Sequence, residues 1–149
     1  EWISSQQDKG ASPPKLWSGI EISCLLKKCL VHIIGLGFDI SSKDMYRYTL
    51  GEAMVGDYLN ANVVIECIHQ SGGIAILAHP ARYRLGFKEL IDEAHINQID
   101  GAEAWYDYQL NPSWKPTPFI CDSIEKYLKG KNLLCSCGTD THGNSLLGR

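Results

Sequence analysis

The sequence predicts an α/β fold in which strands pair in parallel and alternate with helices. Short β-branched runs alternate with stretches whose apolar residues recur at helical spacing. Residues 74–78 (IAILA) are continuously apolar, as expected for a strand buried on both faces of a parallel sheet. With 149 residues, 44% of them hydrophobic, the chain is long enough for one domain with its own core.

The first ordered elements are expected from about Ser18 onward. Residues 4–14 are polar and rich in glycine and proline, so they are interpreted as a loop, and residues 1–17 as a loop or the remnant of a preceding helix. Residues 19–23 and 30–37 are β-branched runs separated by Lys27 and Lys28. They predict two strands joined by a tight polar turn, with Glu21 in the first strand and His32 in the second.

Helices and strands alternate through the rest of the chain. Apolar spacing predicts a helix over residues 56–71, ended by Gly72 and Gly73, and then the strand 74–78, which runs into His79 and Pro80. The same patterns predict a helix at 87–96, a strand at 101–105, a helix at 118–128 and a strand at 133–137. This alternation favours parallel pairing.

Composition excludes several classes of protein. A net charge of -3 and a pI near 5.9 do not indicate a basic surface for nucleic acid or anionic membranes. There is no apolar run of membrane length and no export signal, so a cytoplasmic, non-membrane protein is expected, and no protein partner can be inferred. The six cysteines lie mostly in apolar runs and are expected to be reduced and buried, and the Cys135-x-Cys137 spacing does not fit a zinc knuckle.

Residue types that bind metals collect in or directly after the predicted strands. They are Glu21, His32, His79, Asp140 and His142. The carboxyl ends of parallel strands share one face, and Asp140 and His142 alternate so that both can reach one ion. Carboxylate and imidazole suit Zn²⁺, Mn²⁺ or Fe²⁺. The alternative stays open that Glu21 is an exposed strand residue and that the histidines are core residues bonded to backbone.

Other polar and aromatic residues have less specific interpretations. Glu103 and Asp107 could orient ligand imidazoles, but solvated carboxylates at a strand end are favoured. His69 and His95 lie near helix C-termini and are expected to cap carbonyl groups there. A group of aromatic residues fits nucleobase stacking and ordinary packing equally well: Trp105, Tyr106, Tyr108 and Trp114.

Four motifs follow one another in a characteristic order. They are GIEIS at residues 19–23, HIIGLG at 32–37, GGIAILAHPARY at 72–83 and GTDTHG at 138–143. Together with the 11-residue step from Glu21 to His32 (32 minus 21), they resemble the PHP (polymerase and histidinol phosphatase) family of metal-dependent phosphoesterases. The resemblance runs from about Ser18 to Arg149. Residues 106–114 are similar to the corresponding segment of cyanobacterial stand-alone members.

This resemblance implies the C-terminal part of a distorted (β/α)7 barrel that holds up to three divalent ions, Mn²⁺ first and Zn²⁺ or Fe²⁺ as alternatives. By resemblance Glu21 bridges two ions, His32 and His79 each bind one, and Asp140 and His142 close the site. Arg82 is similar to the family's phosphate-contacting arginine and is the expected catalytic residue, with Tyr83 beside it in substrate binding. The implied substrates are phosphate esters of nucleotides, nucleoside bisphosphates, or RNA and DNA ends.

Two departures from the family pattern limit this expectation. The family's opening H-x-H motif, a further acidic residue and another histidine precede the glutamate motif, whereas only 20 residues precede Glu21 here. We therefore expect an N-terminally truncated domain that lacks about half of the ligand set. The 46 residues between His32 and His79 (79 minus 32 minus 1) also predict a reduced substrate lid. The alternatives are a non-catalytic module that supports a larger protein or weakly binds metal or nucleic acid, and an amidohydrolase-like enzyme for C–N bonds.

Overall fold

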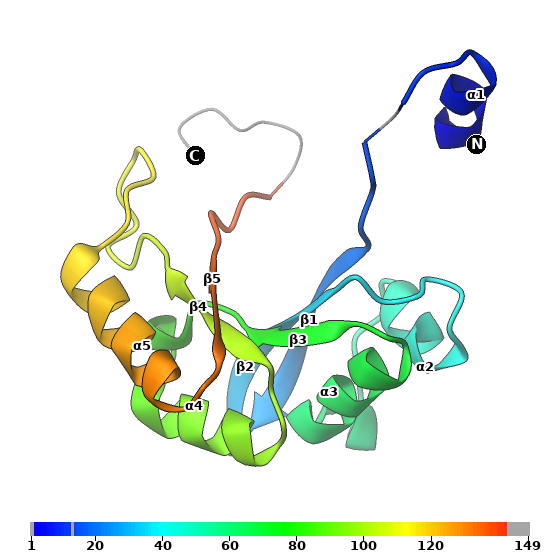
Figure 1. Cartoon of the computed structure of the whole chain (residues 1–149). Coiled ribbons are helices and arrows are strands. Elements are labelled where there is room, and N and C mark those ends of the chain that lie inside the picture. The colour runs from blue at the N-terminus through cyan, green and yellow to red at the C-terminus, as the bar shows by residue number, and fades with distance from the viewer. Residues whose placement is uncertain (1, 13, 143–149) are drawn as a thin grey trace.

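A five-stranded sheet with helices on one face forms the centre of the computed structural model, which describes residues 2–12 and 14–142 (Figure 1). The strands are β1 Gly19–Leu26, β2 Cys29–Leu36, β3 Ile74–Leu77, β4 Gly101–Trp105 and β5 Leu134–Cys137, and they lie in this order across the sheet. The helices that cover one face are α3 Ala61–Gln70, α4 Phe87–Ile96 and α5 Pro118–Gly130. Shorter elements are α1 Trp2–Asp8, α2 Lys43–Tyr46 and the 3-10 turns Arg47–Thr49, Gly56–Leu59 and Pro80–Arg82.

The sheet is mixed, so the prediction of parallel pairing throughout was wrong. β1 pairs antiparallel with β2, and β2 pairs antiparallel with β3, while only β3, β4 and β5 are parallel. The turn between β1 and β2 consists of Lys27 and Lys28, both with positive φ (50° and 61°), and a two-residue turn can only join antiparallel strands. Parallel pairing begins where α4 and α5 provide helical crossovers between strands.

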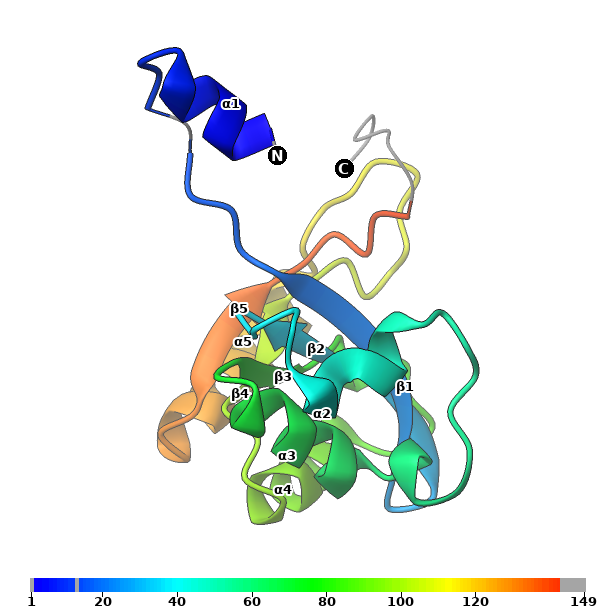
Figure 2. The same cartoon turned by 90° about the vertical axis from the view of Figure 1, so that its right-hand side faces the viewer.

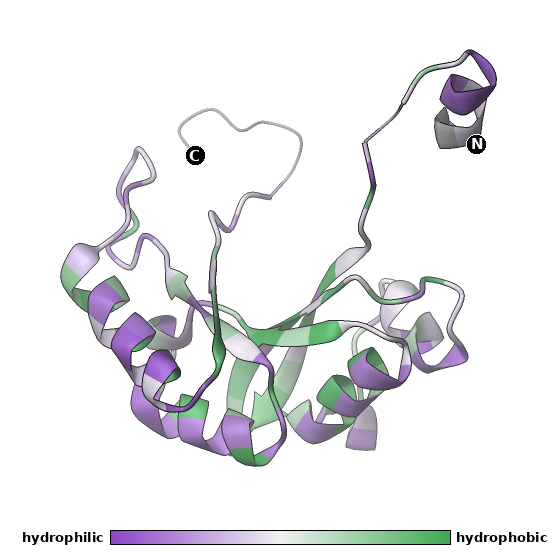
Figure 3. Cartoon of the chain, viewed as in Figure 1, coloured by the Kyte–Doolittle hydropathy of each residue, from purple (hydrophilic) through white to green (hydrophobic). Residues whose placement is uncertain are grey.

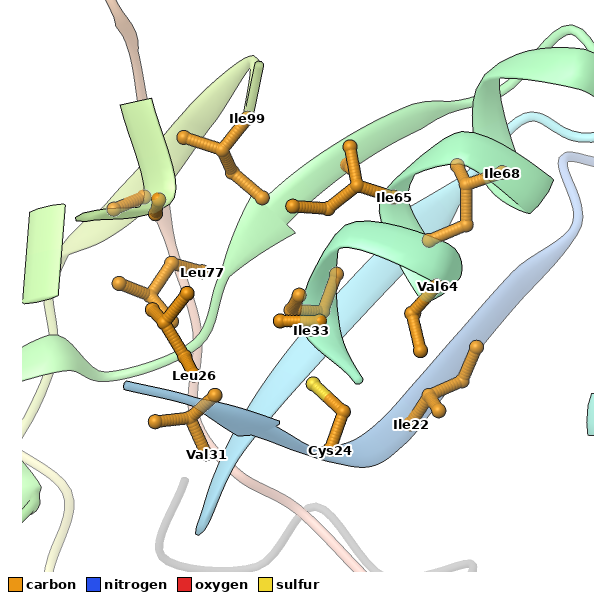
Figure 4. Packing of buried hydrophobic residues seen from close by; sticks show 14 of the residues in the cluster. Ile22, Cys24, Leu26, Val31, Ile33, Val64, Ile65, Ile68, Leu77 and Ile99 are labelled. Carbon is orange, nitrogen blue, oxygen red and sulfur yellow. The ribbon is translucent and has the colours of Figure 1, made fainter. Parts of the chain in front are cut away.

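The hydrophobic core lies between the sheet and its helices. In β1 the buried residues alternate as Ile22, Cys24 and Leu26, and in β2 as Val31 and Ile33. Figure 4 shows these side chains packed with residues of α3, and Figure 3 shows that the helices are polar on their outer surfaces. Because strand side chains alternate between faces, the intervening residues of β1 and β2 point to the opposite side of the sheet.

The helix predicted over residues 56–71 is divided. Asn60 is extended (φ -77°, ψ 133°) and separates a 3-10 turn from α3. The helix α3 ends at Gln70 with Ser71 as its C-cap, and Gly72 follows in the left-handed region (φ 76°). Residues 2–8 form α1 where the sequence favoured a loop from Ser4 onward, and α1 lies apart from the sheet (Figures 1 and 2). Within the described ranges no helix combines the length and apolarity needed to cross a bilayer.

All six cysteines are free, but they are not uniformly buried. Cys24, Cys29 and Cys121 are buried, whereas Cys135 and Cys137 are exposed on β5. The expectation of buried thiols was therefore wrong for β5, which lies at one edge of the sheet.

Candidate metal centre

Glu21, His32 and His79 converge on the sheet face opposite the helices. Each contributes one ligand atom to a group in which all atoms lie within 4.8 Å of one another. Glu21 pairs with Ile34 and His32 with Ser23 in the β1–β2 ladder, so Glu21 and His32 are diagonal neighbours on one face. His79 reaches them from the turn that follows β3.

Three ring nitrogens at this point face Glu21 or the cavity without making a hydrogen bond. His32 Nδ1 lies 2.6 Å and His79 Nε2 lies 3.6 Å from Glu21 Oε1. In spite of the short first distance, His32 Nδ1 and both ring nitrogens of His79 are buried without a partner in hydrogen-bond geometry. A buried polar group without a hydrogen bond costs roughly 1–3 kcal/mol and is kept where it has another role. The interpretation as core histidines bonded to backbone does not hold for these nitrogens.

The charges in the group reinforce one another. Contact with the imidazoles of His32 and then His79 holds the pKa of the Glu21 carboxyl well below its usual range. The same contact with Glu21 raises the pKa of His32. The carboxylate is therefore ionised at neutral pH, as a metal ligand must be.

His79 has a strained backbone at the end of β3. Its φ of 26° and ψ of 62° place it in the left-handed region, and it is 4% exposed. A residue other than glycine in such a conformation carries roughly 1–3 kcal/mol of strain and is typical of functional sites. Pro80 follows directly, and the backbone N–H of His79 donates to Glu103 Oε2 at 2.8 Å.

Asp140 and His142 line the same cavity but lie outside the group of three. The Asp140 Oδ2 atom accepts hydrogen bonds from Tyr106 Oη (2.8 Å) and Arg82 Nη1 (2.5 Å). Burial first, and then this contact with Asp140, raises the pKa of Tyr106 to about 12, so the phenol stays protonated and donates. The His142 ring is 83% exposed, and its Nδ1 lies 3.0 Å from the Asp140 carbonyl oxygen.

The cavity itself has a volume of about 520 Å³, within the range of small-molecule sites. Its wall consists of Glu21, Ser23, His32, Ile34, His79, Glu103, Asp140, Thr141 and His142. All five metal ligands expected from the sequence therefore lie around one space.

Arg82 and Tyr83 lie in the turn after His79 and contact residues that line the cavity. Arg82 Nη1 donates to Tyr106 Oη at 2.7 Å as well as to Asp140. The Tyr83 hydroxyl accepts from the backbone N–H of His32, and its ring lies 5.4 Å from that of His79. In the structure both side chains contact other residues of the site, and their contacts with substrate stay a prediction.

Glu103 is a residue for which the sequence favoured the wrong one of two alternatives. It was interpreted as solvated, but it is 6% exposed and lines the cavity, because β4 is buried on both faces. Burial raises the pKa of its carboxyl. A carboxylate in the middle of the apolar run GAEAW was the available signal.

Two further sequence interpretations were also wrong. Asp107 is 4% exposed rather than solvated, and its carboxylate accepts from the backbone amides of Gln109 and Asn111, so it organises the loop after β4. His69 does not cap α3, since its Nε2 lies 2.8 Å from Asp100 Oδ2.

Comparison with known proteins gives structural neighbours alone. The sequence matches no protein-family model and no curated protein. An amidohydrolase from Chromobacterium violaceum, solved with bound sulfate and no metal, superposes with a TM-score of 0.66 at 16% identity, over 85% of this chain and 67% of that one. A candidate metal-dependent phosphoesterase from Bifidobacterium adolescentis superposes with a TM-score of 0.64 at 16% identity, over 95% and 72%. The chain shares the fold of these two proteins.

Proposed function

We propose that this protein is a metal-dependent hydrolase, and specifically a phosphoesterase. The observation that carries the proposal is the convergence of Glu21, His32 and His79, in which His32 Nδ1 and both ring nitrogens of His79 are buried without a hydrogen bond. One carboxylate and two imidazoles suit a divalent transition metal. One structural neighbour is named a metal-dependent phosphoesterase and the other an amidohydrolase, and both names are those of hydrolases.

The metal proposed is Mn²⁺, with Zn²⁺ or Fe²⁺ as alternatives, and up to three ions in an intact site. Glu21, His32 and His79 would hold the first ion, and Asp140 and His142 extend the donor set around the same cavity. When bound, such ions lower the pKa of a coordinated water and neutralise charge on phosphate oxygens.

The chain's own residues would orient the substrate. Arg82 carries forked donors that fit the oxygens of a phosphate better than lysine would. Tyr106 and Asp140 hold its Nη1 atom, which restricts the guanidinium to one region beside the cavity. The proposed substrates are phosphate esters of nucleotides, nucleoside bisphosphates or short RNA or DNA ends. The sulfate bound to the Chromobacterium neighbour, which resembles phosphate in shape, is in line with an anionic substrate.

Hydrolysis of a C–N bond is the second candidate, because that same neighbour is named an amidohydrolase. A module that binds metal without catalysis is the third. The three differ in what is released from a substrate, so they can be separated directly.

The test combines metal analysis with substrate assays. The wild-type protein, E21Q, H79A and the control H69A are analysed for Mn²⁺ after dialysis and then assayed with a nucleoside 3',5'-bisphosphate and with a panel of N-acyl amino acids. His69 is a matched control because it also pairs with a carboxylate, Asp100, but lies outside the cavity.

We expect phosphate release by wild type and H69A, and loss of metal and activity in E21Q and H79A. Amide cleavage alone would favour the second candidate. Bound metal without turnover would favour the third, and absence of metal from the wild type would disprove a metal centre.

A further inference from the structure

We propose that Glu103 is a positioning residue of the metal centre, which holds the backbone of His79 and sets its distance from the segment that carries Asp140 and His142. The inference rests on the proposed function, because it concerns a ligand of that centre. Glu103 lies outside the group of three candidate ligands, and its Oε2 atom accepts the His79 amide.

The hydrogen bond from His79 N to Glu103 Oε2 takes the place of a backbone hydrogen bond between β3 and β4. The β3–β4 ladder pairs Ile76 with Gly101 and Leu77 with Ala102, and it stops there. The amide of His79 therefore has no strand partner, and the side chain of Glu103 accepts it at 2.8 Å. This bond is made by a residue with left-handed φ, whose conformation must be held by its surroundings.

The other carboxylate oxygen of Glu103 rests against Gly138. A Cβ added at Gly138 would overlap Glu103 Oε1 and lie 2.8 Å from its Cδ. Gly138 does not have a positive φ, so the close approach, rather than the backbone conformation, requires glycine there. Gly138 also donates its N–H to the Trp105 carbonyl at 3.2 Å, and it lies two residues before Asp140.

Glu103 thus lies between the two segments that carry the expected ligands. On one side it bonds the turn of His79, and on the other it limits how closely Gly138 and the chain after it can approach. Such carboxylates behind metal ligands fix ligand orientation, and their loss typically weakens metal binding about 10–100-fold.

The test compares E103A, E103Q and D100A in the full chain. E103Q keeps the shape and an acceptor oxygen for the His79 amide. D100A is the matched control, because Asp100 also accepts a β3 amide, that of Ala75 at 2.6 Å, but at the other end of the strand. Co²⁺ serves as the probe, and its dissociation constant and d–d absorption spectrum are the first two readouts. The third is the amide ¹H shift of His79, measured in the protein without Co²⁺.

We expect E103A to weaken Co²⁺ binding about 10–100-fold, change the spectrum and shift the His79 amide resonance upfield. E103Q should stay within about threefold of wild type. D100A should bind Co²⁺ like wild type even though its thermal midpoint falls, which separates positioning from general stability.

A second set of variants tests the same role if E103A folds poorly. G138A forces its methyl group against the carboxylate and should weaken Co²⁺ binding, whereas E103A/G138A should bind no more weakly than E103A, a non-additive result. Wild-type Co²⁺ affinity and spectrum in E103A, or equal weakening in D100A, would overturn the positioning role alone. Absence of Co²⁺ binding by the wild type would overturn the proposed function and this role together.

Discussion

The Tyr83 hydroxyl accepts a hydrogen bond of 2.8 Å from the backbone nitrogen of His32, a residue 51 positions earlier in the chain. The Tyr83 ring also packs beside both imidazoles of the candidate centre, 6.3 Å from His32 and 5.4 Å from His79 between ring centroids. Burial raises the pKa of this phenol, so the hydroxyl remains neutral. One side chain therefore links the turn after β3 to the strand that carries His32.

Tyr83→Phe tests this link. The ring is kept, but the amide of His32 loses its acceptor, and we expect a loss of roughly 1–3 kcal/mol in the free energy of unfolding. Urea denaturation of the two proteins measures it. If Tyr83 acts on the substrate alone, stability will be unchanged and only the KM for phosphate ester will rise.

Tyr106→Phe tests the contact that holds Asp140. The variant removes the hydroxyl that donates to Asp140 and accepts from Arg82, and we expect about 10–100-fold lower metal affinity or kcat/KM. Steady-state kinetics and metal titration measure the effect. Tyr127→Phe is the control, because it removes a similar bond of 2.7 Å to Asp92 away from the cavity. An equal effect of both variants would contradict the prediction.

Gly101→Ala tests the pairing of β4 with β5. A Cβ at this position would lie 2.7 Å from the Leu134 Cβ and 2.8 Å from its carbonyl carbon, so we expect a destabilisation of at least about 1–3 kcal/mol. Gly130→Ala is the control of opposite sign. It meets open space at the end of α5 and should raise stability by up to about 1 kcal/mol. Denaturant midpoints compare the two, and an unaffected Gly101→Ala would refute the close packing.

Thiol labelling tests the burial of the cysteines. Burial raises the pKa of Cys24 to about 12, which leaves almost no reactive thiolate at pH 8. We expect a thiol reagent to modify Cys135 and Cys137 in the native protein, and Cys24, Cys29 and Cys121 only in denaturant. Peptide mass spectrometry identifies the order. Labelling of Cys24 before unfolding would show that this side chain is not buried in the core.

Local sequence signals predicted individual elements well. The helix at 87–96 and the strand at 101–105 have the predicted bounds, because hydrophobic periodicity reports how each element buries its own face. The pairing of β1 and β2 with β3 was not predicted correctly. Alternation of helices and strands favours parallel pairing, yet the direction of each strand depends on how the chain crosses between strands.

The sequence by itself determined which residue types could bind a metal and where they stand relative to strands: Glu21 and His32 within strands, and His79 after one. Only the tertiary structure decided which of them meet. It brought Glu21, His32 and His79 together, bonded Asp140 to Arg82 and Tyr106, and buried Glu103 against His79 and Gly138. The physical reason is that periodicity describes the surroundings of one element. Contacts between distant residues depend on strand register and on packing across the sheet, which no single segment encodes.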